Sequence, residues 1–195
     1  MIGFQKFWGH LSTITRHRHK VIAHCARAGI LWQGLRHDLS KYSPTEFWQG
    51  VKFFDGTHSP TEDERRTLGY SLAWMHHKGR NRHHWEYWTD LDMQTKAYAA
   101  VPMPPKYLAE MVADRIAACK TYQGASYTDA SALGYLERSN EARLMHPDTV
   151  RALRFLLTKL RDEGEHAAFC YIKTCLRKNV PFCGQETQSG TIVGI

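Results

Sequence analysis

The sequence contains no apolar run near the roughly 20 residues that a membrane-spanning helix requires. Its first six residues also lack the charged-then-apolar order of a secretory signal peptide. The five cysteines are odd in number and no two have CxxC spacing, which argues against a zinc ribbon or a disulfide framework. We therefore expect a cytoplasmic protein that does not contact a membrane and whose thiols stay reduced.

Strand-like alternation of useful length is also missing, as is any internal repeat with a period of about 20 to 50 residues. There is no arginine-rich arm, because the 26 Lys and Arg residues are spread along the chain among 19 acidic residues. The net charge of +7 nevertheless favours anionic partners, either phosphate esters or nucleic acid.

Helical patterns dominate what remains. Apolar residues repeat at helical spacing over residues 4–14, and a further helix is expected over about 16–28, before Gly29. The tetrapeptide Ser-Pro-Thr-Glu occurs at 43–46 and 59–62, and each copy is a capping box with Pro at the first helical position. Helices should start at both copies, the first ending near residues 55–56 and the second continuing to about residue 78. The capping box alone is enough to explain Glu46.

The second half of the chain predicts further helices over residues 107–122, from Pro147 through Leu160, and over 167–177. Residues 80–92 are aromatic and rich in histidine, and their structure is left open. The length of 195 residues suits one domain with a single core. The predicted fold class is all-α, a single-domain helical bundle over residues 1–183 followed by a disordered tail over 184–195.

Histidine is the most informative residue type. Ten of the 12 histidines lie before residue 85, and imidazole is the commonest metal ligand. Adjacent His37 and Asp38 can bind one metal from two sides if the backbone turns between them, and the second carboxylate oxygen can bridge to another metal. Lys41 then brings a positive charge within reach of a phosphate oxygen. The alternative is an ordinary His-Asp pair at a helix end.

Four more histidines cluster between residues 76 and 84: His76, His77, His83 and His84. Neutral imidazoles held by a metal avoid repulsion from the Lys and Arg residues of the same segment. The alternative is a basic loop that binds an anion or nucleic acid. Which member of each histidine pair faces inward is left open.

Two helices carry the remaining candidates. His17 shares one helix face with His24 and is either a ligand or a half-buried polar residue, whereas His24 is expected to be packed. Glu110 and Asp114 lie four residues apart, and Asp114 lies beside an apolar face. A carboxylate there needs a partner because burying an unpaired charge is costly. That partner is a metal or a cation such as Arg115.

The order of these residues, with His17 first, then His37-Asp38, then the histidine cluster and then Asp114, resembles the HD superfamily, which is named for its His…His-Asp…Asp metal set. Residues 37–41 (HDLSK) are similar to the HD-x-x-K form of that motif. More closely, the chain resembles a family of bacterial and viral proteins known as a domain of unknown function. It shares residues 33–47 (QGLRHDLSKYSPTEF), 76–88 (HHKGRNRHHWEYW) and 114–118 (DRIAA) with that family. The likeness covers roughly residues 10–165.

The HD resemblance implies a helical bundle of the HD type with a mono- or dinuclear metal site and, most often, phosphoester hydrolysis. The first metal would be held by His17, His37, Asp38 and Asp114. A second would be held by Asp38 with one histidine from each of the pairs 76/77 and 83/84, with His77, His83 and His84 as the candidates. Mn²⁺, Fe or Co²⁺ suits such mixed histidine and carboxylate ligands.

The leading hypothesis is therefore a metal-dependent phosphohydrolase that acts on a phosphate ester, with a nucleotide as the expected substrate. Asp38 and Lys41 would serve catalysis, and Lys41 with Arg80 or Arg82 would steady the phosphate oxygens. Glu86 or Glu110 would orient a ligating histidine. The alternatives are a di-iron oxygenase of the HD type and a non-catalytic module that binds nucleic acid or protein around a structural or vestigial metal. The sequence does not indicate an oligomeric state.

Overall fold

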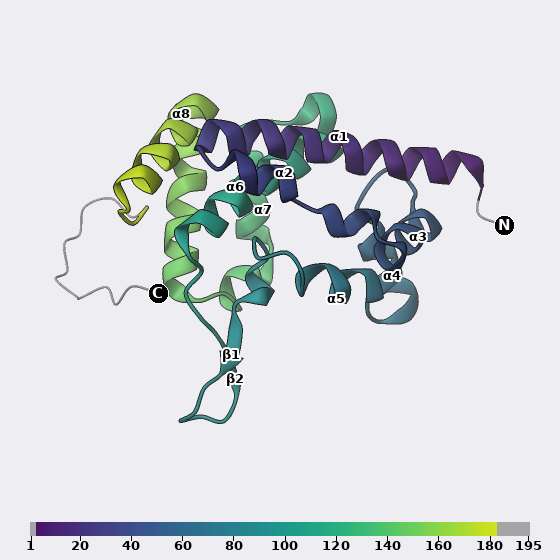
Figure 1. The fold of residues 1–195 in the computed structure, drawn as a ribbon, viewed down its shortest axis with the longest axis horizontal. Coiled ribbons are helices and arrows are strands. Elements are labelled where there is room, and N and C mark those ends of the chain that lie inside the picture. Colours follow the sequence, from purple (N-terminus) through teal and green to yellow (C-terminus); the bar gives the residue numbers. More distant parts are fainter. Residues whose placement is uncertain (1–2, 183–195) are drawn as a thin grey trace.

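The computed structural model describes residues 3–182, and within that range the chain folds into eight α-helices with one small β-hairpin (Figure 1). The expectation of an all-α fold is therefore confirmed. None of the helices in this range combines the length and apolar character that crossing a bilayer would demand. The tail expected over residues 184–195 lies outside the described residues, as does Cys183.

The N-terminal segment forms one long helix, α1 (Phe4–Ala28), where the sequence suggested two. The prediction was wrong because no helix-breaking residue interrupts the chain near residue 15. The buried positions recur every three or four residues from His10 to Ala28, so the same face packs inward across the expected break. Gly29 ends the helix in the left-handed conformation, with φ at 80°.

Helix α2 (Leu31–Arg36) and the 3₁₀ turn η1 (Leu39–Tyr42) follow, and α2 packs against α1. Helix α3 (Pro44–Phe53) starts at the first Ser-Pro-Thr-Glu copy, where the Ser43 hydroxyl accepts a hydrogen bond from the Glu46 backbone N–H. At the second copy, α4 (Pro60–Leu68) starts as expected, but Ser59 makes no capping side-chain bond.

The helix expected to continue to about residue 78 is in fact two helices. Helix α4 ends at Gly69, whose φ of 82° only glycine adopts readily. Ser71 then caps a new helix, α5 (Leu72–Lys78), by accepting from the Trp74 backbone N–H. This break reorients the chain so that α5 packs against α3.

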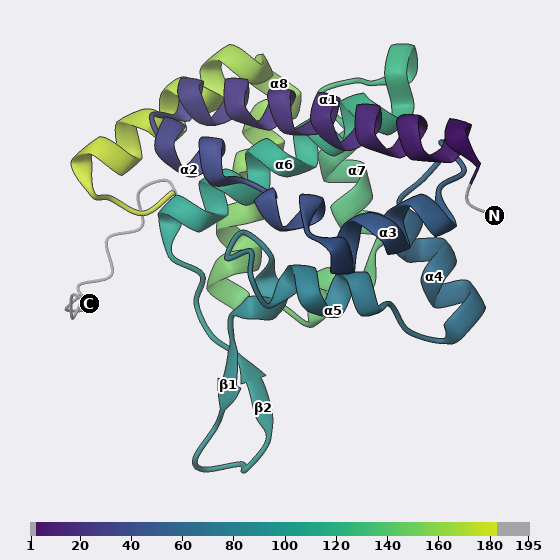
Figure 2. The same cartoon turned by 45° about the vertical axis from the view of Figure 1, so that its right-hand side comes forward.

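The histidine-rich segment, whose structure the sequence left open, forms the 3₁₀ turn η2 (Trp85–Tyr87) and strand β1 (Thr89–Leu91). Strand β1 pairs antiparallel with β2 (Tyr98–Ala100), and Thr89 lies opposite Ala100. The hairpin projects from the helical body (Figure 2). Strands of three residues are too short to produce a recognisable alternation in the sequence.

Three helices complete the core. Helix α6 (Pro105–Gln123) packs against both α1 and α8 and buries residues on almost every side. Helix α7 (Ser131–Arg138), which the sequence did not indicate, lies between the 3₁₀ turns η3 (Gly124–Ser126) and η4 (Asn140–Arg143). The two last helices predicted from the sequence join as α8 (Pro147–Lys178), kinked at Gly164.

Candidate metal centre

Seven side chains from five segments of the chain converge inside the helical body. They come from α1, from the turn after α2, from α5, from the loop after α5 and from α6. Two sets of potential ligand atoms result, and within each set all atoms lie within 4.8 Å of one another. The first set is His17, His37, Asp38 and Asp114, and the second is Asp38, His77, His83 and His84.

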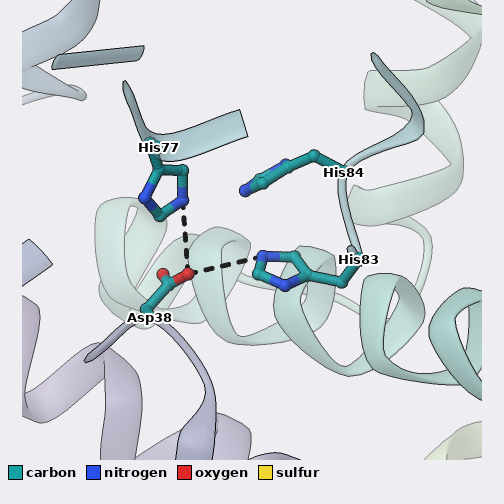
Figure 3. Close-up of side chains that lie close together, drawn as sticks. All are labelled: Asp38, His77, His83 and His84. Atoms are coloured by element: carbon teal, nitrogen blue, oxygen red, sulfur yellow. Dashed lines mark ion pairs between the residues drawn. The ribbon is translucent and has the colours of Figure 1, made fainter. Parts of the chain in front are cut away.

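Asp38 belongs to both sets because each of its carboxylate oxygens faces a different one. Oδ2 lies 3.2 Å from Nε2 of His37, whereas Oδ1 lies 3.2 Å from Nε2 of His77 and 3.4 Å from Nε2 of His83. Figure 3 shows the last two rings pointing at that same oxygen from different segments. The Asp38 backbone has a φ of 54°, an uncommon value outside glycine, and this left-handed turn aims the carboxylate into the core.

The first set closes through α1 and α6. Nε2 of His17 lies 2.9 Å from Oδ1 of Asp114, and Nε2 of His37 lies 3.6 Å from the same oxygen. The second Asp114 oxygen lies 3.7 Å from Nε2 of His83. Asp114 therefore lies close to both sets. Only Asp38, however, belongs to both, with one oxygen facing each set.

Glu110 contacts one histidine of each set, on the side of the ring that faces away from Asp38. Its Oε1 accepts hydrogen bonds from Nδ1 of His37 (2.9 Å) and Nδ1 of His83 (3.1 Å). Gln33 donates to its other oxygen. Because Nδ1 of each ring faces Glu110, Nε2 is the ring nitrogen that faces the centre. A carboxylate in this position is the usual partner of a metal-binding histidine.

Glu46 likewise accepts hydrogen bonds from Nδ1 atoms, here those of the neighbouring His76 and His77. Its two oxygens accept from Nδ1 of His76 (2.6 Å) and Nδ1 of His77 (2.7 Å), and the residue is only 5 % exposed. The capping box explained its backbone but not its side chain, which turns away from the cap. The contact depends on α3 packing against α5, and no local sequence pattern reveals that pairing.

The histidine cluster thus divides three to one. His77 and His83 are buried with Nε2 toward Asp38, and His84 completes the second set. Burial, with the neighbouring His83 and His77, holds the pKa of His84 well below its usual value, so its ring stays neutral. His76 instead turns toward Glu46 and belongs to neither set.

The charges of the centre favour a cation. Burial alone would lower the pKa of His37, but Asp38, Asp114 and Glu110 outweigh it and hold that pKa well above the usual value. Despite their burial, Asp38 and Asp114 keep pKa values well below the usual range because of the surrounding histidines. Burial would also raise the pKa of Glu110, but its two histidine partners lower that pKa to about 2. These carboxyl groups therefore stay ionised at neutral pH.

The donor atoms also fit a metal. Among the described residues, the buried side-chain atoms without a hydrogen-bond partner include Nε2 of His37, His77, His83 and His84 and Oδ1 of Asp38. Oδ2 of Asp38 instead faces the Lys41 ammonium, and Nε2 of His17 faces Asp114. Buried polar atoms are almost always hydrogen-bonded, so this many unsatisfied nitrogen and oxygen atoms facing one region indicate a further partner. Imidazole nitrogen and carboxylate oxygen together are the donors that Mn²⁺, Fe²⁺ and Co²⁺ accept.

A cavity of about 640 Å³ opens beside the centre. Ligand residues of both sets line it, and so do the cationic side chains Lys41, Arg65 and Arg115. The Lys41 ammonium lies 2.7 Å from Oδ2 of Asp38. Burial would lower the pKa of Lys41, but Asp38 and Asp114 raise it above its usual value, so Lys41 keeps its charge.

Two residues expected at the phosphate lie elsewhere. Arg80 is exposed and donates to the His76 carbonyl oxygen, and Arg82 is exposed and donates to the Tyr107 hydroxyl. Neither lines the cavity, because the buried histidines of their loop turn inward and leave both arginines on the outside. Arg65 and Arg115, which the sequence did not single out for this role, line it instead. Glu86 also lines the cavity, but its Oε2 lacks a hydrogen-bond partner.

Comparison with models of known protein families gives a match that covers most of the chain. Residues 6–159 match a family of unknown function, DUF5662. No curated protein and no solved structure is significantly similar to the chain. The matched range contains every residue of both ligand sets, together with Glu46 and Glu110. The chain therefore belongs to the DUF5662 family of unknown function.

Proposed function

We propose that this protein is a metal-dependent phosphohydrolase of the HD type that acts on a phosphate ester. The observation that carries the proposal is the sharing of Asp38 between two ligand sets, with one oxygen toward each. A carboxylate with one oxygen toward each of two sets of histidines, beside an open cavity, would be suited to holding two cations, as two-metal phosphoester hydrolases do.

The metal would be Mn²⁺, Fe²⁺ or Co²⁺, given the donor atoms. Such an ion lowers the pKa of a bound water toward about 7 and draws charge from a phosphoryl oxygen. His17, His37, Asp38 and Asp114 would hold one ion, and Asp38, His77, His83 and His84 the other.

The other side chains of the cavity have roles that follow from their contacts. Lys41 keeps its charge, and an ammonium has three N–H donors, so it can bind a phosphoryl oxygen without leaving Asp38. Arg65 lies over the Trp74 ring, 5.2 Å from its centroid, and adds positive charge at the cavity wall. Fixed positive groups of this kind stabilise the charge that develops on a transferring phosphoryl group.

Metal content is the first test. The purified protein should carry up to two equivalents of a transition metal in elemental analysis. Asp38→Ala should lose most of it, because Asp38 belongs to both sets, and His37→Ala should lose about one equivalent. His166→Ala is the matched control, because His166 is exposed on α8 and belongs to neither ligand set. It should keep the wild-type metal content.

Activity is the second test. With added Mn²⁺, the wild type should cleave at least one member of a panel of phosphate esters and nucleotides, and Asp38→Ala, purified in the same way, should not. Equal trace metal in all four proteins and no cleavage by any of them would refute the proposal. Bound iron with oxygen-dependent turnover would indicate a di-iron oxygenase instead.

A further inference from the structure

The cavity has a second polar region, made by Glu86 and Arg115, that neither ligand set uses. Both residues line the same cavity as His84 and Asp114. Oε2 of Glu86 is buried without a hydrogen-bond partner, and so are Nε and Nη1 of Arg115. The remaining guanidinium nitrogen, Nη2, donates to Glu141, which also lines the cavity.

The unpartnered atoms of Glu86 and Arg115 lower the stability of the folded protein. A buried carboxylate oxygen and buried guanidinium N–H groups lose their water without gaining a partner. A ligand that supplies N–H donors to Glu86 and an acceptor to Arg115 would satisfy both groups together.

Aromatic rings stand beside this polar pair. Trp85 and Tyr135 line the same cavity, and the Arg115 guanidinium lies 5.7 Å from the centroid of the Tyr135 ring. Flat rings next to hydrogen-bonding groups are typical of sites that hold a nucleobase by stacking and by its edge. A cavity of about 640 Å³ falls in the usual range of small-ligand sites, roughly 300 to 1,000 Å³.

We propose that Glu86 and Arg115 bind the base of a guanine nucleotide whose phosphate lies at the metal centre. The inference rests on the proposed function for the position of the phosphate. Guanine presents two neighbouring N–H donors, at N1 and N2, beside the acceptors O6 and N7. The carboxylate of Glu86 would accept from the two donors, and Arg115 would donate to O6. Adenine presents an amino group in place of O6 and would place a donor against the guanidinium.

Nucleoside binding tests this assignment without any hydrolysis. Guanosine has no phosphate, so it should bind the chelator-treated protein, measured by calorimetry or by quenching of tryptophan fluorescence. Inosine lacks only the N2 amine and should bind at least tenfold more weakly, because one donor to Glu86 is missing. Adenosine should bind more weakly than guanosine by a similar or larger factor.

Substitution of Glu86 then identifies the residue responsible. Glu86→Gln should weaken guanosine binding about tenfold or more and bring the guanosine-to-inosine ratio close to one. Glu163→Gln is the matched control, since Glu163 is exposed on α8 and should leave the ratio unchanged. Circular dichroism shows whether each variant folds.

Equal binding of guanosine, inosine and adenosine by the wild type would overturn the inference, and so would no binding of any of them. A folded Glu86→Gln protein with the wild-type ratio would also overturn it. If that variant does not fold, the wild-type ratio decides. Failure of the hydrolysis tests leaves this result unaffected, because no step in it needs metal or a phosphate.

Discussion

Replacing Glu110 by glutamine should weaken metal binding at both ligand sets without unfolding the protein. The substitution keeps the size of the side chain but removes the negative charge that faces His37 and His83. It also places an amide N–H₂ where Gln33 now donates to a carboxylate oxygen. Both effects loosen the hold on two rings that belong to different sets.

The magnitude follows from the number of ligands that Glu110 orients. Loss of a group that orients one ligating histidine typically weakens metal binding 10- to 100-fold, or about 1.4 to 2.7 kcal/mol. Glu110 orients one histidine in each set, so each site should weaken by about that factor. The protein should remain folded, because the amide oxygen can still accept from an imidazole N–H.

Competition with a chromogenic chelator measures the affinity of each site for Mn²⁺ or Co²⁺, and circular dichroism reports folding. Glu137→Gln is the control, since Glu137 is exposed on α7 and pairs only with Arg154 among the described ion pairs. A folded Glu110→Gln variant with wild-type affinity at both sites would show that the histidines do not depend on this carboxylate.

Three further predictions concern other parts of the structure. Glu46→Gln should lower the metal content from about two equivalents toward one, because Glu46 orients His77 in the second set only. Elemental analysis measures this, and equal loss from both sites would contradict it. Gly34→Ala should destabilise the protein by about 1 to 3 kcal/mol in urea unfolding, because its Cβ would lie 2.5 Å from Cβ of Cys25; Gly79→Ala, whose nearest contact is 3.5 Å, should cost little. Burial, and to a lesser extent Lys41, lowers the pKa of His10 from 6.5 to about 4 in the folded protein. As pH drops from 6.5 to 4, the imidazole of the unfolded chain therefore binds a proton before that of the folded protein does, and the free energy of unfolding falls. His10→Asn should remove up to about 3 kcal/mol of that pH dependence, and an unchanged slope of stability against pH would show that His10 does not contribute.

The convergence of the candidate ligand residues could be anticipated from the sequence because histidine and aspartate are rare in a core. Asp114 lies beside an apolar face, where a carboxylate needs a partner. His37 and Asp38 are adjacent in sequence and can face one ion only if the backbone turns between them. Residue type and position alone therefore point toward a shared ion. The helices containing these residues also follow from apolar periodicity, because one face of α1 and most of α6 are buried.

The orienting carboxylate of the second set was harder to find, because it depends on packing between helices that are distant in sequence. Glu46 has a sufficient local explanation as part of a capping box, and that explanation hides its role toward His77. Which of the clustered histidines face Asp38 also depends on helix packing. It depends on the break at Gly69, which sets how α5 meets α3, and a single glycine in a helical pattern does not by itself predict a break.

Positive charge was the least predictable part. Arg80 and Arg82 lie close in sequence to His77 and His83, but the buried rings occupy the inner side of the loop and leave the arginines outside. Sequence proximity to a ligand therefore says little about which face of the chain a flexible cation occupies. Arg115, next to Asp114 on α6, reaches the cavity instead.

Anomalous diffraction from crystals grown with Mn²⁺ tests the central claim most directly. Two peaks about 4 Å apart are expected, one on each side of the Asp38 carboxylate. One peak should lie within bonding distance of His17 and Asp114, and the other within bonding distance of His77 and His83. The absence of any peak at Asp38, with its side chain still bonded to Lys41, would contradict the account.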